Sequence, residues 1–112
     1  MLTSVILSYC RVTDDGVRVL AGAPALALLY LTGCSLVSDA GVLALGAASS
    51  LTDLDLSYCP LVTDEGLLAL GTLPVLARVG LFMTQLGAPL VTDEGVARLW
   101  ALLGSRKAPM RP

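Results

Sequence analysis

Hydrophobic residues follow two different periods along this chain, and the change from one to the other recurs four times. Short segments such as Leu54-Asp55-Leu56 place apolar residues at every second position, which is typical of a half-buried strand. About ten residues later, apolar residues such as Leu67 and Leu70 show the i, i+3 spacing of one helix face. The pattern therefore predicts four strand–turn–helix units in an α/β array.

The strand pattern also predicts which side chains face the core. Alternate residues of a strand point to opposite faces, so one set faces the helices and the other faces away. The predicted inward residues are Val5 and Leu7, Leu29 and Leu31, Leu54 and Leu56, and Val79 and Leu81.

Each predicted helix begins with the same signal. Thr13, Ser38, Thr63 and Thr92 are good N-caps, because a hydroxyl oxygen can accept a hydrogen bond from a free backbone N–H. Asp and Glu fill the first turn, where the helix dipole favours negative charge, so we interpret these acids as capping groups and not as catalysts. We expect the helices to end near Gly22, Gly46, Gly71 and Gly104.

A glycine follows each cap after three residues, at Gly16, Gly41, Gly66 and Gly95. Glycine disfavours a helix by about 1 kcal/mol relative to Ala. Its presence in all four units therefore indicates a packing reason, and we expect neighbouring units to approach closely there. The glycines are 25, 25 and 29 residues apart, and this period is that of a repeat array.

The repeats predict the organisation of the whole chain. We place them at about residues 2–25, 26–50, 51–75 and 76–103, with 104–112 as a loose tail. The fourth repeat carries four extra residues around Gly87-Ala88-Pro89, which we interpret as a tolerated loop or as one lip of a binding site. No polar capping repeat precedes Leu2, so the chain is expected to be part of a longer array or to pair end to end.

The repeat resembles the cysteine-containing subclass of leucine-rich repeats, L-x-x-L-x-L-x-x-C-x-x-[VI]-[TS]-D-x-G-[LV]-x-x-L, over residues 2–103. The third copy matches throughout, and the fourth has Thr84 in place of Cys. This resemblance implies a curved solenoid with parallel strands on the concave face and helices on the convex face, which binds a protein partner on the concave side. It also implies a link to F-box/leucine-rich-repeat substrate receptors of SCF-type ubiquitin ligases, or to relatives without an F-box, although no F-box precedes Leu2.

Three cysteines, Cys10, Cys34 and Cys59, follow three of the strands at one equivalent position. Parallel neighbouring strands would stack them in a column, in which the parallel Cβ vectors do not suit a disulfide and the row does not suit tetrahedral zinc. We expect buried structural thiols, with redox chemistry or metal binding as the alternatives. No metal and no cofactor are expected.

Composition narrows the classes of partner. The net charge is −2 and the seven basic residues are scattered, which argues against nucleic acid and anionic membranes. Residues 19–38 carry no charge over a length that could span a bilayer, but they read as two half-repeats joined by a turn. The N-terminus lacks the basic region of a signal peptide, so we expect an intracellular protein.

Residues that point away from the core form columns across the strands, and four of the five aromatic residues of the chain fall in them. An uncharged aromatic surface is typical of an interface core, although Tyr9 and Tyr58 are also explained as cover for the turn. The candidate partner-binding residues are Ile6, Tyr9, Tyr30, Asp53, Asp55, Tyr58, Arg78 and Phe82.

Two of these candidates also raise the question of catalysis. Asp53 and Asp55 share a face about 6.6 Å apart, which could suit a hydrolase, but Arg78 would neutralise Asp53 on an open surface. With no His in the chain, nucleophilic pairs with histidine are excluded. We therefore predict a protein-interaction module and not an enzyme. The alternatives are a purely structural extension of a longer solenoid and, more remotely, a hydrolase.

Overall fold

The computed structural model describes residues 3–81 and 91–104. Four three-residue strands form one parallel sheet in chain order: β1 (Ser4–Ile6), β2 (Leu28–Tyr30), β3 (Asp53–Asp55) and β4 (Arg78–Gly80). The register pairs Ile6 with Tyr30, Tyr30 with Asp55, and Asp55 with Gly80. These pairs confirm the predicted alignment of the repeats.

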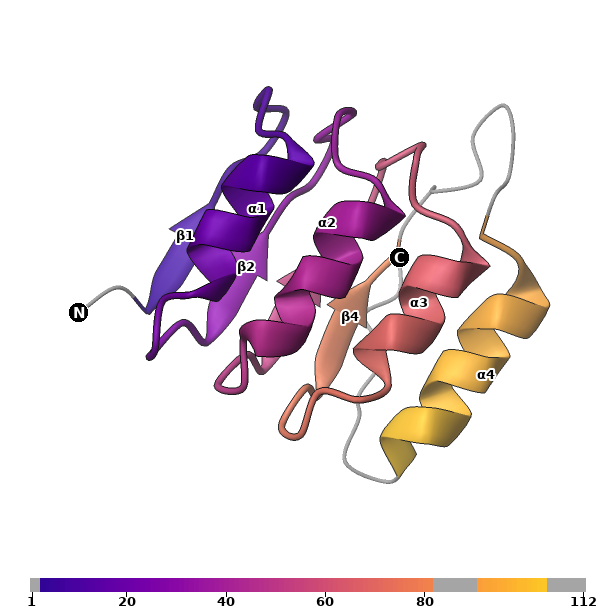
Figure 1. Cartoon of the computed structure of the whole chain (residues 1–112). Helices are drawn as coiled ribbons and strands as arrows, with labels where there is room; N and C mark the ends of the chain where they lie inside the picture. The colour runs from indigo at the N-terminus through magenta and orange to yellow at the C-terminus, as the bar shows by residue number, and fades with distance from the viewer. Residues whose placement is uncertain (1–2, 82–90, 105–112) are drawn as a thin grey trace.

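A helix follows each strand and returns the chain to the start of the next one. The helices are α1 (Asp14–Ala21), α2 (Asp39–Ala44), α3 (Asp64–Leu70) and α4 (Asp93–Leu103). They lie side by side on one face of the sheet (Figure 1). The predicted α/β solenoid is therefore confirmed as two layers, strands on one side and helices on the other.

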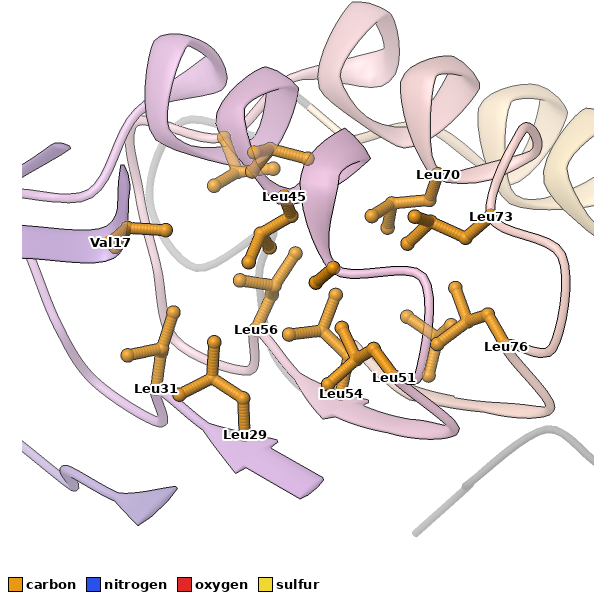
Figure 2. Packing of buried hydrophobic residues seen from close by; sticks show 14 of the residues in the cluster. Val17, Leu29, Leu31, Leu45, Leu51, Leu54, Leu56, Leu70, Leu73 and Leu76 are labelled. Carbon is orange, nitrogen blue, oxygen red and sulfur yellow. The ribbon is translucent and has the colours of Figure 1, made fainter. Parts of the chain in front are cut away.

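The core is a ribbon of leucines between these two layers. Leu29, Leu54 and Leu56 extend from the strands toward Leu45 and Leu70 of the helical layer (Figure 2), and all five are fully buried. Because each repeat contributes equivalent residues, the core continues from one repeat to the next and has no single centre.

Val5 and Leu7 pack against the core, as predicted for inward residues, but their burial is incomplete. Val5 and Leu7 are only half-buried, whereas their equivalents Leu29 and Leu31 are fully buried. The physical reason is that no described repeat lies on the N-terminal side of β1, so these two side chains pack against neighbours on one side only.

The helix ends follow the predicted glycines in three cases of four. Gly22, Gly71 and Gly104 are the C-cap residues of α1, α3 and α4. Near Gly46, α2 ends at Ala44 and the chain continues as a 3₁₀ turn, η1 (Leu45–Ala47), so Gly46 lies within that turn and is not a C-cap. No described helix has the length and apolar character needed to cross a membrane.

The turn after each of the first three strands contains one residue with left-handed backbone geometry. Tyr9 and Tyr58 have φ of 57° and 61°, and Gly33 occupies the equivalent position with φ of 72°. This conformation is uncommon for a bulky residue. At Tyr9 and Gly33 it is supported by backbone bonds to the next repeat, in which the two N–H groups donate to the carbonyls of Thr32 and Ser57, both at 2.7 Å.

Candidate functional site

The strand residues that point away from the helices form the surface that we call the outer sheet face. It consists of two columns in register across the four strands: Ser4, Leu28, Asp53 and Arg78, and Ile6, Tyr30, Asp55 and Gly80. Exposure decreases along the second column, since Ile6 is 63% exposed, Tyr30 and Asp55 are half-buried and Gly80 is buried.

Apolar and aromatic groups gather at the β1 and β2 end of this face. Ile6 lies beside Tyr30 in the register, and Tyr9 is 70% exposed in the turn that follows β1. A Cβ atom on Gly33 would overlap the Tyr9 ring, so the absence of a side chain at Gly33 makes room for that ring. Tyr58, in the turn after β3, is 39% exposed.

Charged groups occupy the middle of the same face. The Asp53 carboxylate accepts a hydrogen bond from the Thr52 hydroxyl at 2.8 Å and lies 3.5 Å from the Arg78 guanidinium, as the register predicts. The Asp55 carboxylate accepts the backbone N–H of Ser57 at 2.7 Å through Oδ1. Each carboxylate is thus oriented by its own strand segment, and neither is directed at the other.

Sequence reasoning missed part of the exposed apolar surface. Leu36 and Leu61 are 37% and 48% exposed in the turns after β2 and β3, and Leu61 is close in sequence to Tyr58. The signal was the apolar pair Leu-Val in each turn, of which only the second, Val37 or Val62, is buried. The eighth candidate residue, Phe82, and the loop at residues 84–90 lie outside the described residues.

A second arrangement, between the repeats, joins each helix start to the next one. The Asp14 carboxylate accepts the backbone N–H of Ser38 at 2.7 Å and its hydroxyl at 2.6 Å. Asp64 does the same for Thr92, at 2.8 and 2.6 Å. The first acid of α1, α2 and α3 therefore binds the cap residue of the following repeat, which the capping interpretation did not foresee.

The cap hydroxyls take part in two bonds at once. While donating to the preceding aspartate, Ser38, Thr63 and Thr92 accept a backbone N–H of their own helix. Thr13 makes no such side-chain cap bond, and the prediction for this residue is wrong. No described repeat precedes Thr13 to supply the aspartate that orients the hydroxyl in the other three caps.

The glycines after the caps lie directly against these aspartates. A Cβ atom added to Gly41 would lie 2.5 Å from Oδ1 of Asp14, and one added to Gly66 would meet Asp39 more closely still. Gly95 stands in the same relation to Asp64. At Gly16, by contrast, the added atom would meet Val12 of its own repeat. Adjacent repeats therefore approach closely at three of the four glycines.

Two of the three cysteines bridge adjacent repeats. The Cys34 thiol donates to the Leu7 carbonyl at 2.8 Å, and the Cys59 thiol donates to the Leu31 carbonyl at 3.1 Å. Burial raises the pKa of the Cys34 thiol and raises that of Cys59 to about 12. Both thiols are therefore protonated donors at neutral pH.

The expectation of a buried thiol at Cys10 is wrong, since this residue is exposed. Its sulfur lies 3.6 Å from the Ser8 carbonyl of its own turn. In the described part of the chain no earlier repeat offers the carbonyl that Cys34 and Cys59 use.

Comparisons with known proteins agree with this geometry. A family model described as a leucine-rich repeat matches residues 1–21 and 47–71. A chain from the crystal structure of the Rad7 and Elc1 complex in yeast is similar in fold, with a TM-score of 0.66 at 23% sequence identity. That match covers 87% of this chain and 24% of the other, so this chain spans about a quarter of its structural neighbour. No curated protein matches the sequence.

The family match, the parallel strands in register and the helices that follow them lead to one assignment. The apolar columns and the joints between repeats recur at the same positions of the repeat. The chain has the fold of a leucine-rich repeat array, and the leucine-rich repeat model matches parts of its first and third repeats.

Proposed function

We propose that this chain is a protein-interaction module that binds a partner protein through the outer sheet face and the adjoining turns. Leucine-rich repeats typically present an extended binding surface on one side of the solenoid. The observation that carries the proposal is the apolar cluster of exposed Ile6 and Tyr9 with half-buried Tyr30, beside the carboxylates of Asp53 and Asp55.

The fold requires these positions to face away from the core but does not require apolar residues at them. Ile6 is 63% exposed although it lies in a strand whose neighbouring residue contributes to the core. Aromatic side chains supply large contact areas and are enriched among residues that dominate binding energy. An apolar cluster next to oriented carboxylates suits a partner that presents apolar side chains beside a basic residue, because complementary charge fixes the register of such a contact.

A finer role follows from the resemblance to F-box/leucine-rich-repeat proteins. We propose that the module recognises substrates for an SCF-type ubiquitin ligase when it acts together with the segments that recruit the ligase. The structural neighbour was solved in complex with a second protein, Elc1, which supports an assembly role for this kind of array. A protein bound at the outer sheet face would then be a substrate and not a scaffold component.

The test compares a variant of the outer sheet face with a control variant that truncates exposed apolar side chains on the helices. One carries Ile6→Ala and Tyr30→Ala on the outer sheet face, and the other carries Val19→Ala and Leu43→Ala on the exposed side of the helices, where these side chains are 77% and 63% exposed. Proteins captured by the unmodified chain are identified by mass spectrometry, purified, and titrated against all three chains by calorimetry.

The proposal predicts that affinity for the captured protein falls at least about tenfold in the sheet-face variant, as expected for the loss of a dominant aromatic contact, and is unchanged in the helix-face variant. Asp55→Asn, which keeps the acceptor for the Ser57 N–H, should weaken binding more at low salt than at high salt. Equal affinities for all three folded chains would contradict the proposal and favour a purely structural role.

The ligase role has its own readout. Ubiquitination of the captured protein in cells should depend on the outer sheet face and fall with the same sheet-face variant. Binding without any change in ubiquitination would leave the interaction module in place and reject the ligase role.

A further inference from the structure

The two ends of the array differ in how well their apolar residues are covered. At the C-terminal end, Val79, Val91 and Leu99 are buried, and Leu81 is half-buried. At the N-terminal end, the corresponding side chains of the first repeat are only half-buried. We call the latter surface the N-terminal face; its apolar residues are Val5, Leu7, Val12 and Leu20.

Each of these four residues has a buried equivalent in the next repeat. Leu29, Leu31, Val37 and Leu45 are fully buried because the first repeat packs against them. The N-terminal face therefore has the same apolar pattern as the equivalent side of the later repeats. There, the preceding repeat covers it.

The polar groups of this face follow the same pattern. The carbonyls of Tyr30 and Thr32 accept the N–H groups of Leu7 and Tyr9 from the preceding repeat, at 2.8 and 2.7 Å. The first-repeat equivalents of these acceptors are the carbonyls of Ile6 and Ser8. Within the described residues no preceding strand reaches them.

Two side chains of the N-terminal face, Cys10 and Thr13, also lack the partners that their equivalents in the second repeat have. The Cys34 thiol donates to a carbonyl of the preceding repeat, whereas Cys10 is exposed. The Ser38 N–H and hydroxyl bind Asp14 of the preceding repeat, whereas Thr13 makes no cap bond. In the described structure, three kinds of partner are therefore missing at this face: strand N–H donors for the carbonyls of Ile6 and Ser8, a carbonyl for the Cys10 thiol, and a carboxylate for Thr13. One further repeat would supply all three.

We propose that the N-terminal face is a docking surface for another leucine-rich repeat of the 25-residue type, which presents its strand to β1 and its first helical aspartate to Thr13. The fourth repeat of a second copy fits this description less well. It has four extra residues between strand and helix, and its strand residue Val79 is already buried. A second copy turned about a two-fold axis would offer no carboxylate, because Asp14 is directed at Ser38.

The experiment adds such a repeat and follows the reactivity of Cys10. A copy of residues 26–50 is inserted between Met1 and Leu2, with Cys34→Ser in the copy so that only the three native thiols react. In the unmodified chain one thiol should react quickly with a disulfide reagent and two slowly. In the extended chain the reaction of Cys10 should slow at least about tenfold, because it then requires local opening of the new joint.

A matched control carries Asp39→Asn in the inserted copy, which keeps the apolar contacts and removes the carboxylate. The extended chain should also unfold at a higher urea concentration than the unmodified chain. The control should lose part of this increase and part of the protection of Cys10. A second extended chain, with a copy of residues 51–75 and Cys59→Ser in that copy, guards against failure of the first insert to fold.

The proposal is overturned if Cys10 reacts at its original rate in both extended chains while circular dichroism shows the added helix. It is also overturned if the unmodified chain self-associates in analytical ultracentrifugation and Cys10 becomes protected as the chain concentration rises. The second result would assign the face to a second copy.

Discussion

The Asp39 carboxylate holds the start of the next repeat, since it accepts both the backbone N–H of Thr63, at 2.8 Å, and the Thr63 hydroxyl. The two residues are 24 positions apart in the chain. Because the Thr63 hydroxyl also accepts the N–H of Glu65, one carboxylate fixes the position of α2 relative to α3 and orients the cap of α3.

Asp39→Asn should therefore weaken the joint between the second and third repeats. An amide has one acceptor oxygen and would turn its N–H₂ group toward the second donor, so the free energy of unfolding should fall by about 1.5–3 kcal/mol. Urea denaturation measures this change. Asp15→Asn is the control: Asp15 pairs only with Arg18 on the surface, and its loss should cost less than about 1 kcal/mol. Equal losses would mean that Asp39 acts only through the helix dipole.

Gly66→Ala tests the close approach of the same two repeats. Alanine favours a helix by about 1 kcal/mol relative to glycine. The added Cβ would collide with Asp39, however, and such overpacking costs about 1–3 kcal/mol, so a net loss of stability is expected. Gly46→Ala is the matched control, because nothing lies within 4 Å of its added atom. This change should be neutral or stabilising by up to about 1 kcal/mol.

A double mutant separates the collision from other effects of Gly66→Ala. When Asp39→Ala is already present, the added methyl group no longer collides with a carboxylate. The stability losses of the two single variants should therefore sum to more than the loss of the double variant, by at least about 0.5 kcal/mol. Strictly additive losses would rule out direct contact as the reason for glycine at this position.

The joints between repeats show where sequence reasoning stopped. The acids after the caps were assigned to the helix dipole, which is a property of a single helix. Their main partners are the cap residues of the next repeat. The position directly after the cap holds Asp in all four repeats whereas the next position varies, and the dipole of a single helix gives no reason for that difference. The recurring glycine was the available signal, since it required a neighbour at that point.

The fold was predictable because the same strand and helix pattern recurs in each of the four repeats. Cys10 was misplaced for the same reason, since the pattern assigns it the environment of Cys34 although only the later repeats have a described repeat before them. The left-handed turn was also missed. Of the three residues at this position only Gly33 is of a type that favours positive φ, whereas Tyr9 and Tyr58 are not.

Leu56→Ala should remove part of the continuous core. The Leu56 side chain is fully buried between the strands and the helical layer, so truncation should cost about 2–5 kcal/mol. Leu43→Ala removes the same atoms from a side chain that is 63% exposed on α2, and should change stability by no more than about 0.5 kcal/mol. Urea midpoints followed by circular dichroism give both values. A small effect at Leu56 would contradict the packing seen in Figure 2.

Alkaline pH should destabilise the fold through Cys59. Burial raises the pKa of this thiol from 9.0 to about 12, so between these values the unfolded chain releases a proton that the folded chain keeps. The stabilisation is complete below the unfolded pKa and is lost as the pH rises, with a slope of up to about 1.4 kcal/mol per pH unit from this one thiol. Urea denaturation across this range, compared between the unmodified chain and Cys59→Ala, isolates the contribution, because Cys34 and the other titrating groups are common to both. The slope should be shallower in the variant, and identical slopes would show that Cys59 ionises in the folded chain as readily as in the unfolded one.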